Sequence, residues 1–433
     1  MTILAGLLAE HAAISEDRIA ALRSALGRGR LDTVYEKRLP GLYLAKLDLG
    51  MLDGAGWIDE GSQGLSGVVG EPLPGSVPAD RQQQLRTLHG AFRAGRFDVL
   101  ERCRGTFAAL HLAPERGLLH LFTDRIGVRP LYVARGDGLL LFASALGVIE
   151  RSGLIDLGVD LDAVAEASVF GVPLGTRTPY REVECLRECT HLTLSLSETR
   201  PSPRVRSYFR WDRCEQQELA PCCHAGHVLE RFQQAIAVRR STGGNGDTAS
   251  RMECSFLSGG LDSRAIVAEL RAQGATVHGY NFSFRRMLDA VLAEQTAEAL
   301  GVTLHSGRLP LCRRDFDLSA ILAAHLQHRP ASVWSGDGGS VLAGHVYIDE
   351  PLVGVFRSQG LEAGARAFLH ARGSAGQVAR RLFGRAWWPL LEDLPLNAMC
   401  AELARFDCAD PARALYLFLL GNDQRRHLAG HFE

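Results

Sequence analysis

Lysine is almost absent from this sequence, and its scarcity excludes one common way of binding phosphate. Arginine and lysine together number 48, but lysine occurs only at Lys37 and Lys46. A Walker-type phosphate loop carries a lysine directly after its second glycine, so no such loop lies beyond residue 46. A nucleotide site in the second half of the chain therefore needs another arrangement of residues.

Other absences limit the class of protein. The 10 cysteines are scattered, without the even spacing of a secreted disulfide scaffold. No apolar run approaches the ~18–20 residues that span a bilayer, and the apolar N-terminal segment lacks a basic leader. The formal net charge is −1, with no long basic or acidic block. We therefore expect a cytoplasmic protein with reduced cysteines that binds neither nucleic acid nor a membrane.

The length of 433 residues and the change in pattern along them predict two domains. Residues 1–212 are rich in short strand-like runs with turn signals between them, which indicates a β-rich layered domain. In residues 213–433, strands and helices alternate from Glu253 onward, a pattern typical of parallel βαβ units and a doubly wound sheet. The fold class predicted from the sequence is therefore α/β.

The strongest local signal is the string Ser258-Gly259-Gly260-Leu261-Asp262-Ser263, between an expected strand at 253–257 and an expected helix at 263–273. Glycines let the backbone approach an anion closely, and the N–H groups at a helix start favour negative charge. Asp262 would repel phosphate, so a carboxylate here implies a bridging Mg²⁺. A simple Gly-Gly turn with helix caps is the alternative. The complete string favours a pyrophosphate-binding loop.

With this loop the sequence resembles the asparagine synthetases and their relatives, among them β-lactam synthetase and the lasso peptide cyclases. The family's Ser-Gly-Gly-Leu-Asp-Ser loop matches Ser258–Ser263. An aspartate that opens a helix ending in Leu-Gly is matched by Asp289 and Leu300-Gly301. The family's Ser-Gly-Glu/Asp-Gly stretch is matched by Ser335-Gly336-Asp337-Gly338.

The resemblance implies a fold, cofactors and site residues. The fold would be an αββα layered domain of the Ntn-hydrolase type at 1–212, followed by a doubly wound PP-loop domain at 213–433. The cofactors would be ATP and Mg²⁺, with Mg²⁺ held by Asp262. Asp337 falls where the family keeps a catalytic acidic residue. The positions that correspond to ATP contacts are Leu257, Ser258, Gly259, Gly260, Asp262, Ser263, Phe282, Ser335 and Gly336.

Residues in the N-terminal half resemble the family's glutaminase domain, whose central hairpin is matched by Gly105–Ala108 and Thr123–Tyr132. Asp124 and Arg129 bracket a glycine turn, and we interpret them as a structural ion pair.

The glutaminase machinery itself departs from the family pattern. Thr2 stands where the family has a nucleophilic cysteine, although an N-terminal threonine is a nucleophile in other proteins. The family's Arg-Gly and Asn-Gly-Glu segments, which hold glutamine, have no clear counterpart; Leu65–Ser76 lies where the second would be. We expect an inactive domain, with free ammonia or an amine as nucleophile.

Two features of the second half also depart from the family pattern. Ser340-Val341 stands where the family has Asp-Glu, whose aspartate is its second Mg²⁺ ligand. Serine is a weaker, neutral ligand, and Asp337, three residues earlier, is the candidate substitute. The family continues beyond the stretch resembling Asn422–Arg426 to a lysine that stabilises charge during the reaction. Because the sequence ends at Glu433, we expect a C-terminally incomplete ATP-binding domain, a substituting arginine or an incomplete reaction.

Three other groups of residues have plainer interpretations. Cys222-Cys223-His224 with His227 is interpreted as a linker and helix start, because a zinc site would need a second ligand pair at recognisable spacing. His325 and His328 are interpreted as a helix end, with substrate contact as the alternative. Trp387-Trp388-Pro389 is expected in a helical core.

The reaction expected from these observations is ATP-dependent amide formation from a small-molecule or peptide carboxylate. One alternative makes asparagine from aspartate with ammonia. A second is a natural-product amide ligase or macrocyclase, which Thr2 favours because an intramolecular amine needs no ammonia source. The third is a non-catalytic nucleotide-binding paralogue, which Ser340 and the missing lysine both favour. The sequence leaves the oligomeric state open, with a homodimer among the options.

Overall fold

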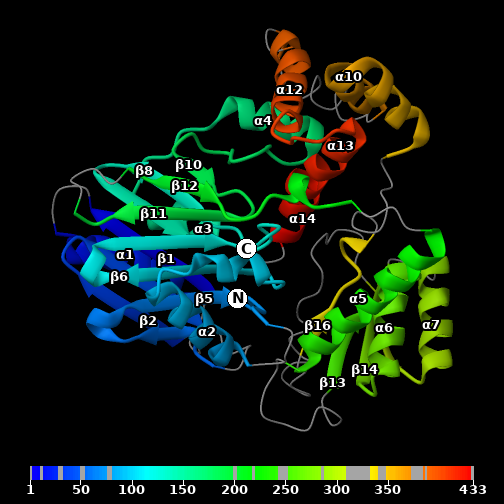
Figure 1. The fold of residues 1–433 in the computed structure, drawn as a ribbon, viewed down its shortest axis with the longest axis horizontal. Coiled ribbons are helices and arrows are strands. Elements are labelled where there is room, and N and C mark those ends of the chain that lie inside the picture. The colour runs from blue at the N-terminus through cyan, green and yellow to red at the C-terminus, as the bar shows by residue number, and fades with distance from the viewer. Residues whose placement is uncertain are drawn as a thin grey trace. The chain divides into compact units, whose positions relative to one another are not determined.

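The computed structural model describes thirteen segments of the chain: residues 2–9, 13–27, 33–48, 54–75, 80–197, 202–216, 220–241, 252–283, 287–308, 332–339, 348–371, 384–385 and 388–430. The chain forms two compact units (Figure 1). The first combines Met1–Gly75, Arg81–Glu215 and Gly344–Glu433. The second combines Ser76–Asp80 and Gln216–Ala343. The sequence places a domain boundary between residues 212 and 213, and this boundary stays a prediction.

The first unit contains two antiparallel six-stranded sheets. In spatial order, the first sheet consists of β10 (Val183–Cys185), β8 (Tyr132–Gly136), β9 (Leu139–Ala143), β1 (Ile3–Ala9), β3 (Leu42–Asp48) and β2 (Thr33–Leu39). The turn between β8 and β9 has positive φ at Asp137 (54°) and Gly138 (70°). This is the tight hairpin turn that an Asp-Gly step favours.

The second sheet consists of β12 (Arg204–Ser207), β11 (Thr190–Ser195), β7 (Leu118–Thr123), β6 (Phe107–Ala113), β5 (Leu65–Gly70) and β4 (Trp57–Asp59). Its central hairpin, β6–β7, pairs Ala113 with Leu118 across a short turn. Gly117 in this turn has φ 59°, a backbone conformation that glycine adopts without steric cost.

The two sheets pack face to face, and helices cover their outer sides. Apolar side chains of both sheets, such as Leu44 on β3 and Leu110 on β6, fill the space between them. Helices α1 (Glu16–Leu26) and α3 (Leu146–Ser152) pack on the outer face of the first sheet. Helix α2 (Arg81–Arg93) packs on the outer face of the second. The αββα layering predicted from the sequence is therefore confirmed.

A row of buried histidines crosses the second sheet on the side that faces α2. Arg206 Nε donates to His191 Nδ1 at 2.7 Å, and His191 Nε2 lies 3.0 Å from His120 Nδ1. The rings of His120 and His111 stack at 6.1 Å. Ser66 Oγ is hydrogen-bonded to both His111 and His89 at 2.9 Å. All four histidine side chains are buried.

The C-terminal helices belong to the same unit. They are α10 (Glu350–Ala371), α12 (Trp388–Leu403), α13 (Pro411–Leu419), the π-helical turn Leu420–Gln424 and α14 (Arg425–Ala429). Together with α4 (Leu161–Phe170) they enclose a core that includes Phe170, Phe356 and Phe418 (Figure 1). Gly175 N donates to Asn422 Oδ1 at 2.7 Å, so polar contacts also join the C-terminal segment to the first part of the chain.

The second unit has a four-stranded parallel sheet, as the alternating pattern predicts. In spatial order its strands are β15 (Thr303–Arg308), β14 (Thr276–Ser283), β13 (Met252–Phe256) and β16 (Ser332–Trp334). Helices α5 (Pro221–Ser241), α6 (Leu261–Ala272) and α7 (Leu288–Leu300) contribute apolar side chains to one core with this sheet.

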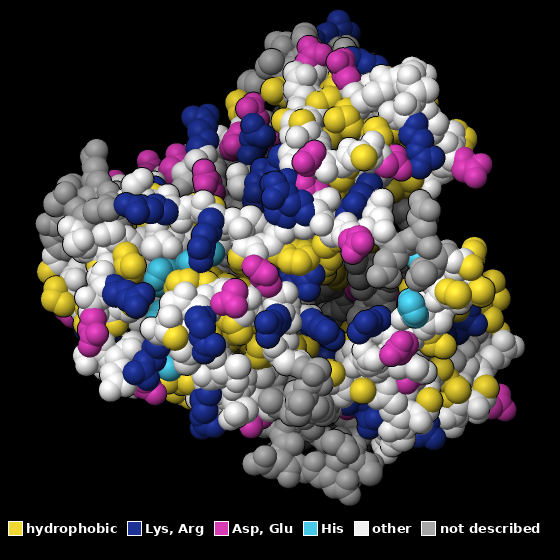
Figure 2. All heavy atoms as spheres, in the orientation of Figure 1, with side chains coloured by type: hydrophobic (Ala, Val, Ile, Leu, Met, Phe, Trp, Pro, Cys, Tyr) yellow, Lys and Arg dark blue, Asp and Glu magenta, His cyan; other side chains and the backbone are white. Residues whose placement is uncertain are grey.

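Charged side chains of both signs are spread over the face of the molecule seen in Figure 2. Across the described segments, no helix has both the length and the apolar character that a membrane crossing requires.

Candidate functional site

The loop after β13 begins at a firmly held residue. Leu257 is 1% exposed, and its backbone N donates to Tyr280 O on β14 at 2.9 Å. The Asn281 side chain then donates from Nδ2 to Leu257 O at 2.8 Å, which extends the pairing of β13 with β14 by one residue. The position at which the chain turns away from the sheet is therefore fixed by β14. In open α/β sheets, ligands bind at this carboxyl end of the strands.

Two serine hydroxyls close the loop. Ser258 N donates to Ser263 Oγ at 3.1 Å, and the two hydroxyl oxygens lie 3.0 Å apart. Gly260 N donates to Ser258 Oγ at 3.1 Å. Ser263 is buried at the start of α6, so its hydroxyl ties the first loop residue to the helix. This network holds the backbone of Ser258–Ser263 in one shape before any ligand binds.

Gly259 lies against the first turn of α7. Its N donates to Asp289 Oδ1 at 2.6 Å. A Cβ at Gly259 would lie 2.8 Å from Asp289 Cα, so any larger residue would push the loop away from α7. The glycine is therefore needed for close packing of backbone on backbone.

The start of α6 keeps backbone donors for an anion. Gly260 is the N-cap residue, and no side chain caps the helix there. Leu261, the first residue of the helix, is 73% exposed, and Asp262 follows in the first turn. Uncapped N–H groups at a helix start, together with the helix dipole, form a site for a phosphate-like anion.

A second predicted segment lies directly against this helix start. A Cβ at Gly336 would lie 2.8 Å from Ser263 N. A Cβ at Gly339 would lie 2.7 Å from the carboxylate oxygen Oδ2 of Asp262. Ser335 Oγ accepts from Asp337 N at 3.2 Å, and the Asp337 side chain is exposed. The structure thus brings Ser335–Gly339 and the Ser258–Ser263 loop together, and at position 336 a larger residue would meet the backbone of α6.

The remaining sequence-predicted positions are placed as follows. Phe282 lies near the end of β14, with its ring 6.5 Å from Tyr280 and 6.3 Å from Phe256. Ser340 and Val341 lie outside the described residues, as do His325, His328 and Trp387. Cys222, Cys223, His224 and His227 lie on α5, where all are exposed. Within the described segments, no three His, Cys, Asp or Glu side chains converge as a metal site would require.

Three contacts of this site were not found from the sequence: the bond of Asp289 to the loop, the bond of Asn281 to Leu257, and a bond from Arg264 Nε to Gly260 O at 3.2 Å. Asn281 is 3% exposed, and in the described structure its Oδ1 has no hydrogen-bond partner. The role of Asn281 could have been inferred from one signal. It is a polar residue in a buried parallel strand, and such strands are otherwise nearly all apolar.

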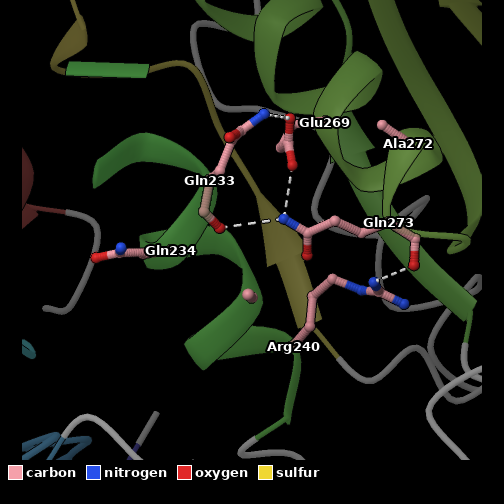
Figure 3. A pocket seen from close by; sticks show the side chains of 7 residues that line it. Gln233, Gln234, Arg240, Glu269, Ala272 and Gln273 are labelled. Atoms are coloured by element: carbon pink, nitrogen blue, oxygen red, sulfur yellow. Dashed lines mark hydrogen bonds between the residues drawn. The ribbon is translucent and has the colours of Figure 1, made fainter. Parts of the chain in front are cut away.

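A surface cleft of the second unit lies elsewhere on α6. A cleft of about 740 Å³ between α5 and α6 is lined by polar side chains such as Gln233, Glu269 and Gln273 (Figure 3). Gln273 Nε2 bridges Gln233 O and Glu269 Oε1, so these groups bind one another. Gln273 follows the C-terminal end of α6, whereas the Ser258–Ser263 loop precedes its N-terminal end. The geometry of the loop, and not the size of this cleft, identifies the candidate site.

The first unit holds a separate buried charge cluster near the start of β1. Lys46 Nζ lies 2.6 Å from Asp48 Oδ2, which also accepts from Arg81 at 2.8 Å. Burial, with the nearby Arg81 charge, lowers the pKa of Lys46 to about 8. Thr2 is buried, with 8% of its surface exposed. Because these charges contact each other and backbone carbonyls of Gly54 and Ala55, the cluster acts as part of the core.

Comparison with known proteins gives matches in both halves of the chain. A family model described as a glutamine amidotransferase domain matches residues 87–208. A model described as asparagine synthase matches residues 248–310, which include the Ser258–Ser263 loop.

A curated relative, "Asparagine synthetase [glutamine-hydrolyzing] 3" of Bacillus subtilis (strain 168), is 27% identical over 232 residues. The match covers 48% of this chain, and it spans about a third (35%) of the length of that relative.

Two solved structures were also matched at 9% identity: the allosteric regulatory enzyme of purine biosynthesis, and the glutamine phosphoribosylpyrophosphate amidotransferase from B. subtilis complexed with ADP and GMP. The TM-scores are 0.33 and 0.32, over 80% of this chain and 93% and 94% of those chains.

Proposed function

Since this chain is a member of the asparagine synthetase family, as the resemblance of its motifs predicts, we propose that it is an ATP-dependent ligase that forms an amide bond. The observation that carries the proposal is the uncapped start of α6, against which the loop and Ser335–Gly339 both pack. Such a loop suits a reaction in which pyrophosphate leaves, because it binds the leaving group.

The proposed reaction has two steps. An oxygen of the substrate carboxylate attacks the α-phosphorus of ATP, and the bond to the bridging oxygen breaks to release pyrophosphate. The nitrogen of ammonia or of an amine then attacks the acyl carbon, loses a proton and displaces AMP. The backbone N–H groups at the start of α6 and the hydroxyls of Ser258 and Ser263 would bind the pyrophosphate. Leu257, Phe282, Ser335 and Gly336 would contact the adenosine.

Mg²⁺ fits the donor set of this loop. Asp262 offers hard carboxylate oxygens beside the helix start, and Mg²⁺ in nucleotide sites takes one or two carboxylates together with phosphate oxygens and water. The ion would neutralise charge on the phosphates when bound. Asp337, exposed on the neighbouring segment, is proposed as the acidic residue that faces the substrate.

For the first domain we propose that glutaminase activity is lost. Thr2 supports this, since it replaces the cysteine that the family uses. The nucleophile would then be free ammonia or an amine carried by the substrate. Thr2 also favours the second candidate function, a natural-product amide ligase or macrocyclase, over synthesis of asparagine. A screen of carboxylates by pyrophosphate release, with aspartate and peptide acids as the two arms, separates these candidates.

Replacement of Asp262 tests the reaction class. Asp262→Asn should abolish ATP–pyrophosphate exchange, because the neutral amide is a poor Mg²⁺ ligand. Asp156→Asn, at an exposed position of the first unit, is the matched control and should exchange at the wild-type rate. Undiminished exchange in Asp262→Asn would refute the assignment of the loop.

A further inference from the structure

Arg264 extends back along α6 toward the loop. It lies four residues after the N-cap Gly260, and long side chains in a helix point toward the helix N-terminus. Its Nε donates to Gly260 O at 3.2 Å, which places the guanidinium beside the start of the helix. The side chain is half-buried. Arg264 therefore presents positive charge where the loop presents its backbone donors.

This contact has little structural use. Gly260 O also accepts from Arg264 N at 3.4 Å and from Ser263 Oγ at 3.3 Å. The carbonyl is therefore satisfied without the guanidinium, and the loop would keep its closure through Ser258 and Ser263. The nitrogens at the far end of the guanidinium make no further hydrogen bond within the described structure.

The charge itself is unfavourable where it stands. A cation near a helix N-terminus is repelled by the helix dipole, and its natural place is the other end. The described residues give Arg264 no ion pair, and Asp262 is the sole acidic residue of the first turn. An anion bound at the loop would convert this repulsion into attraction. A local electrostatic conflict of this kind is expected at functional sites.

We propose that Arg264 binds the pyrophosphate portion of ATP, as the cation that this lysine-poor chain supplies at its phosphate loop. The inference rests on the proposed function, because it assigns a further residue to the same site. A guanidinium suits this task, since its planar fork of N–H donors matches phosphate oxygens in pairs. Release of the Nε bond to Gly260 and a side-chain rotation bring the fork to the anion.

The test is calorimetric titration of the full chain with ATP, pyrophosphate and AMP, each with Mg²⁺. In Arg264→Gln we expect about tenfold or greater loss of affinity for ATP and pyrophosphate, the size of one charge-assisted contact. Affinity for AMP should be unchanged, because AMP lacks the pyrophosphate. Arg264→Lys keeps the charge without the fork and should recover part of the loss.

Arg231→Gln is the matched control. It removes the same charge from an exposed position on α5 in the same unit, and it should leave all three affinities unchanged. Equal losses for ATP and AMP in Arg264→Gln would show a role in shaping the loop and would overturn the proposal. Wild-type affinity for ATP in that variant would overturn it as well, with the proposed function intact. Failure of the wild-type chain to bind ATP would reject both.

Discussion

Asp124 is the residue whose removal should cost the first unit most. Its Oδ1 accepts from the backbone N of Ile126, Gly127 and Val128 at 2.7–3.2 Å. Its Oδ2 accepts from Phe107 N and Arg129 N. Asp124→Ala would remove the side-chain acceptor of five backbone donors, of which Gly127 N keeps the backbone carbonyl of residue 124 at 3.1 Å. We expect a loss of at least about 3 kcal/mol in the free energy of unfolding, measured by chemical denaturation.

The control for this prediction is Asp156→Ala. Asp156 is exposed, so its removal should change the free energy of unfolding by less than about 0.5 kcal/mol. An Asp124→Ala protein as stable as this control would show that the turn is held by the surrounding strands alone.

At the scale of single residues, the sequence predicts the position of the loop but not the individual side-chain contacts. The loop Ser258–Ser263 was predicted from its residue types, because glycine and serine at a strand–helix junction have few other uses. The ion pair between Asp124 and Arg129 stays a prediction, but the structure adds a bond that residue types did not indicate: the carboxylate accepts from the backbone N of Arg129. Such details depend on where a side chain points, and residue spacing does not determine that direction.

The second sheet of the first unit should make stability depend on pH. Burial lowers the pKa of His111 to about 3, of His120 to about 4 and of His191 to about 3, with Arg206 adding repulsion at the last two. Because the folded pKa lies below the ordinary value of about 6.5, protons bind the unfolded chain first. Stability is therefore complete above pH 6.5 and falls as the pH drops toward 4.

The expected slope is about 1.4 kcal/mol per pH unit for each buried histidine. Denaturation at pH 7.5, 6 and 5 measures it, and His120→Gln should reduce the slope by about one proton. His227→Gln, on the exposed part of α5, should leave it unchanged. A flat profile in the wild-type protein would mean that the histidines are hydrated or charged when folded.

At the scale of elements, the sequence predicts that a helix or strand is present better than it predicts the residues at which that element begins and ends. Helix α6 was expected from Ser263 and begins at Leu261, because glycine N-caps leave no side-chain signal. The helical apolar spacing of Val228–Arg239 predicts a helix there, whereas α5 already begins at Pro221, since its exposed first turns lack an apolar period. The Asp-Gly step at Asp137-Gly138 predicts the tight turn observed there, and the sequence predicts a helix over Arg81–Ala94, where α2 spans Arg81–Arg93. Both signals are local.

Across the whole molecule, Glu402 should link the C-terminal helices to the first part of the chain. Its carboxylate contacts Arg187 at 2.6 Å and Arg405 at 2.8 Å. Burial opposes its ionisation, but these guanidiniums hold the pKa of Glu402 at about 2. Glu402→Ala removes the carboxylate that Arg187 binds, and it leaves Arg405 with Glu188 alone. We expect a loss of roughly 2–4 kcal/mol in the unfolding free energy of the first unit.

Glu362→Ala is the comparison for this variant. Glu362 pairs with Arg366 one turn away on α10, but its side chain is 74% exposed, so the loss should be a few tenths of a kcal/mol, as for surface pairs. Hydrogen exchange reports where the effect falls. In Glu402→Ala, faster exchange should appear on both α12 and the β10 region that carries Arg187, whereas faster exchange on α12 alone would contradict the link.

The sequence predicts least well which segments of the chain pack together in each unit. The alternation of strands and helices after Glu253 is a local pattern, and it predicts the parallel sheet of the second unit. That Gly344–Glu433 packs with α4 depends on contacts between residues far apart in the chain. No periodicity encodes such contacts, because an apolar helix face indicates burial but not its partner.

This discontinuity has a consequence for synthesis on the ribosome. The core around Phe170 receives Phe356, Leu403 and Phe418, which are translated only after the entire parallel sheet. Helix α4 therefore emerges with its apolar side still uncovered, and vectorial folding cannot finish this core first. Nascent chains stalled before residue 344 should be the ones that chaperones hold.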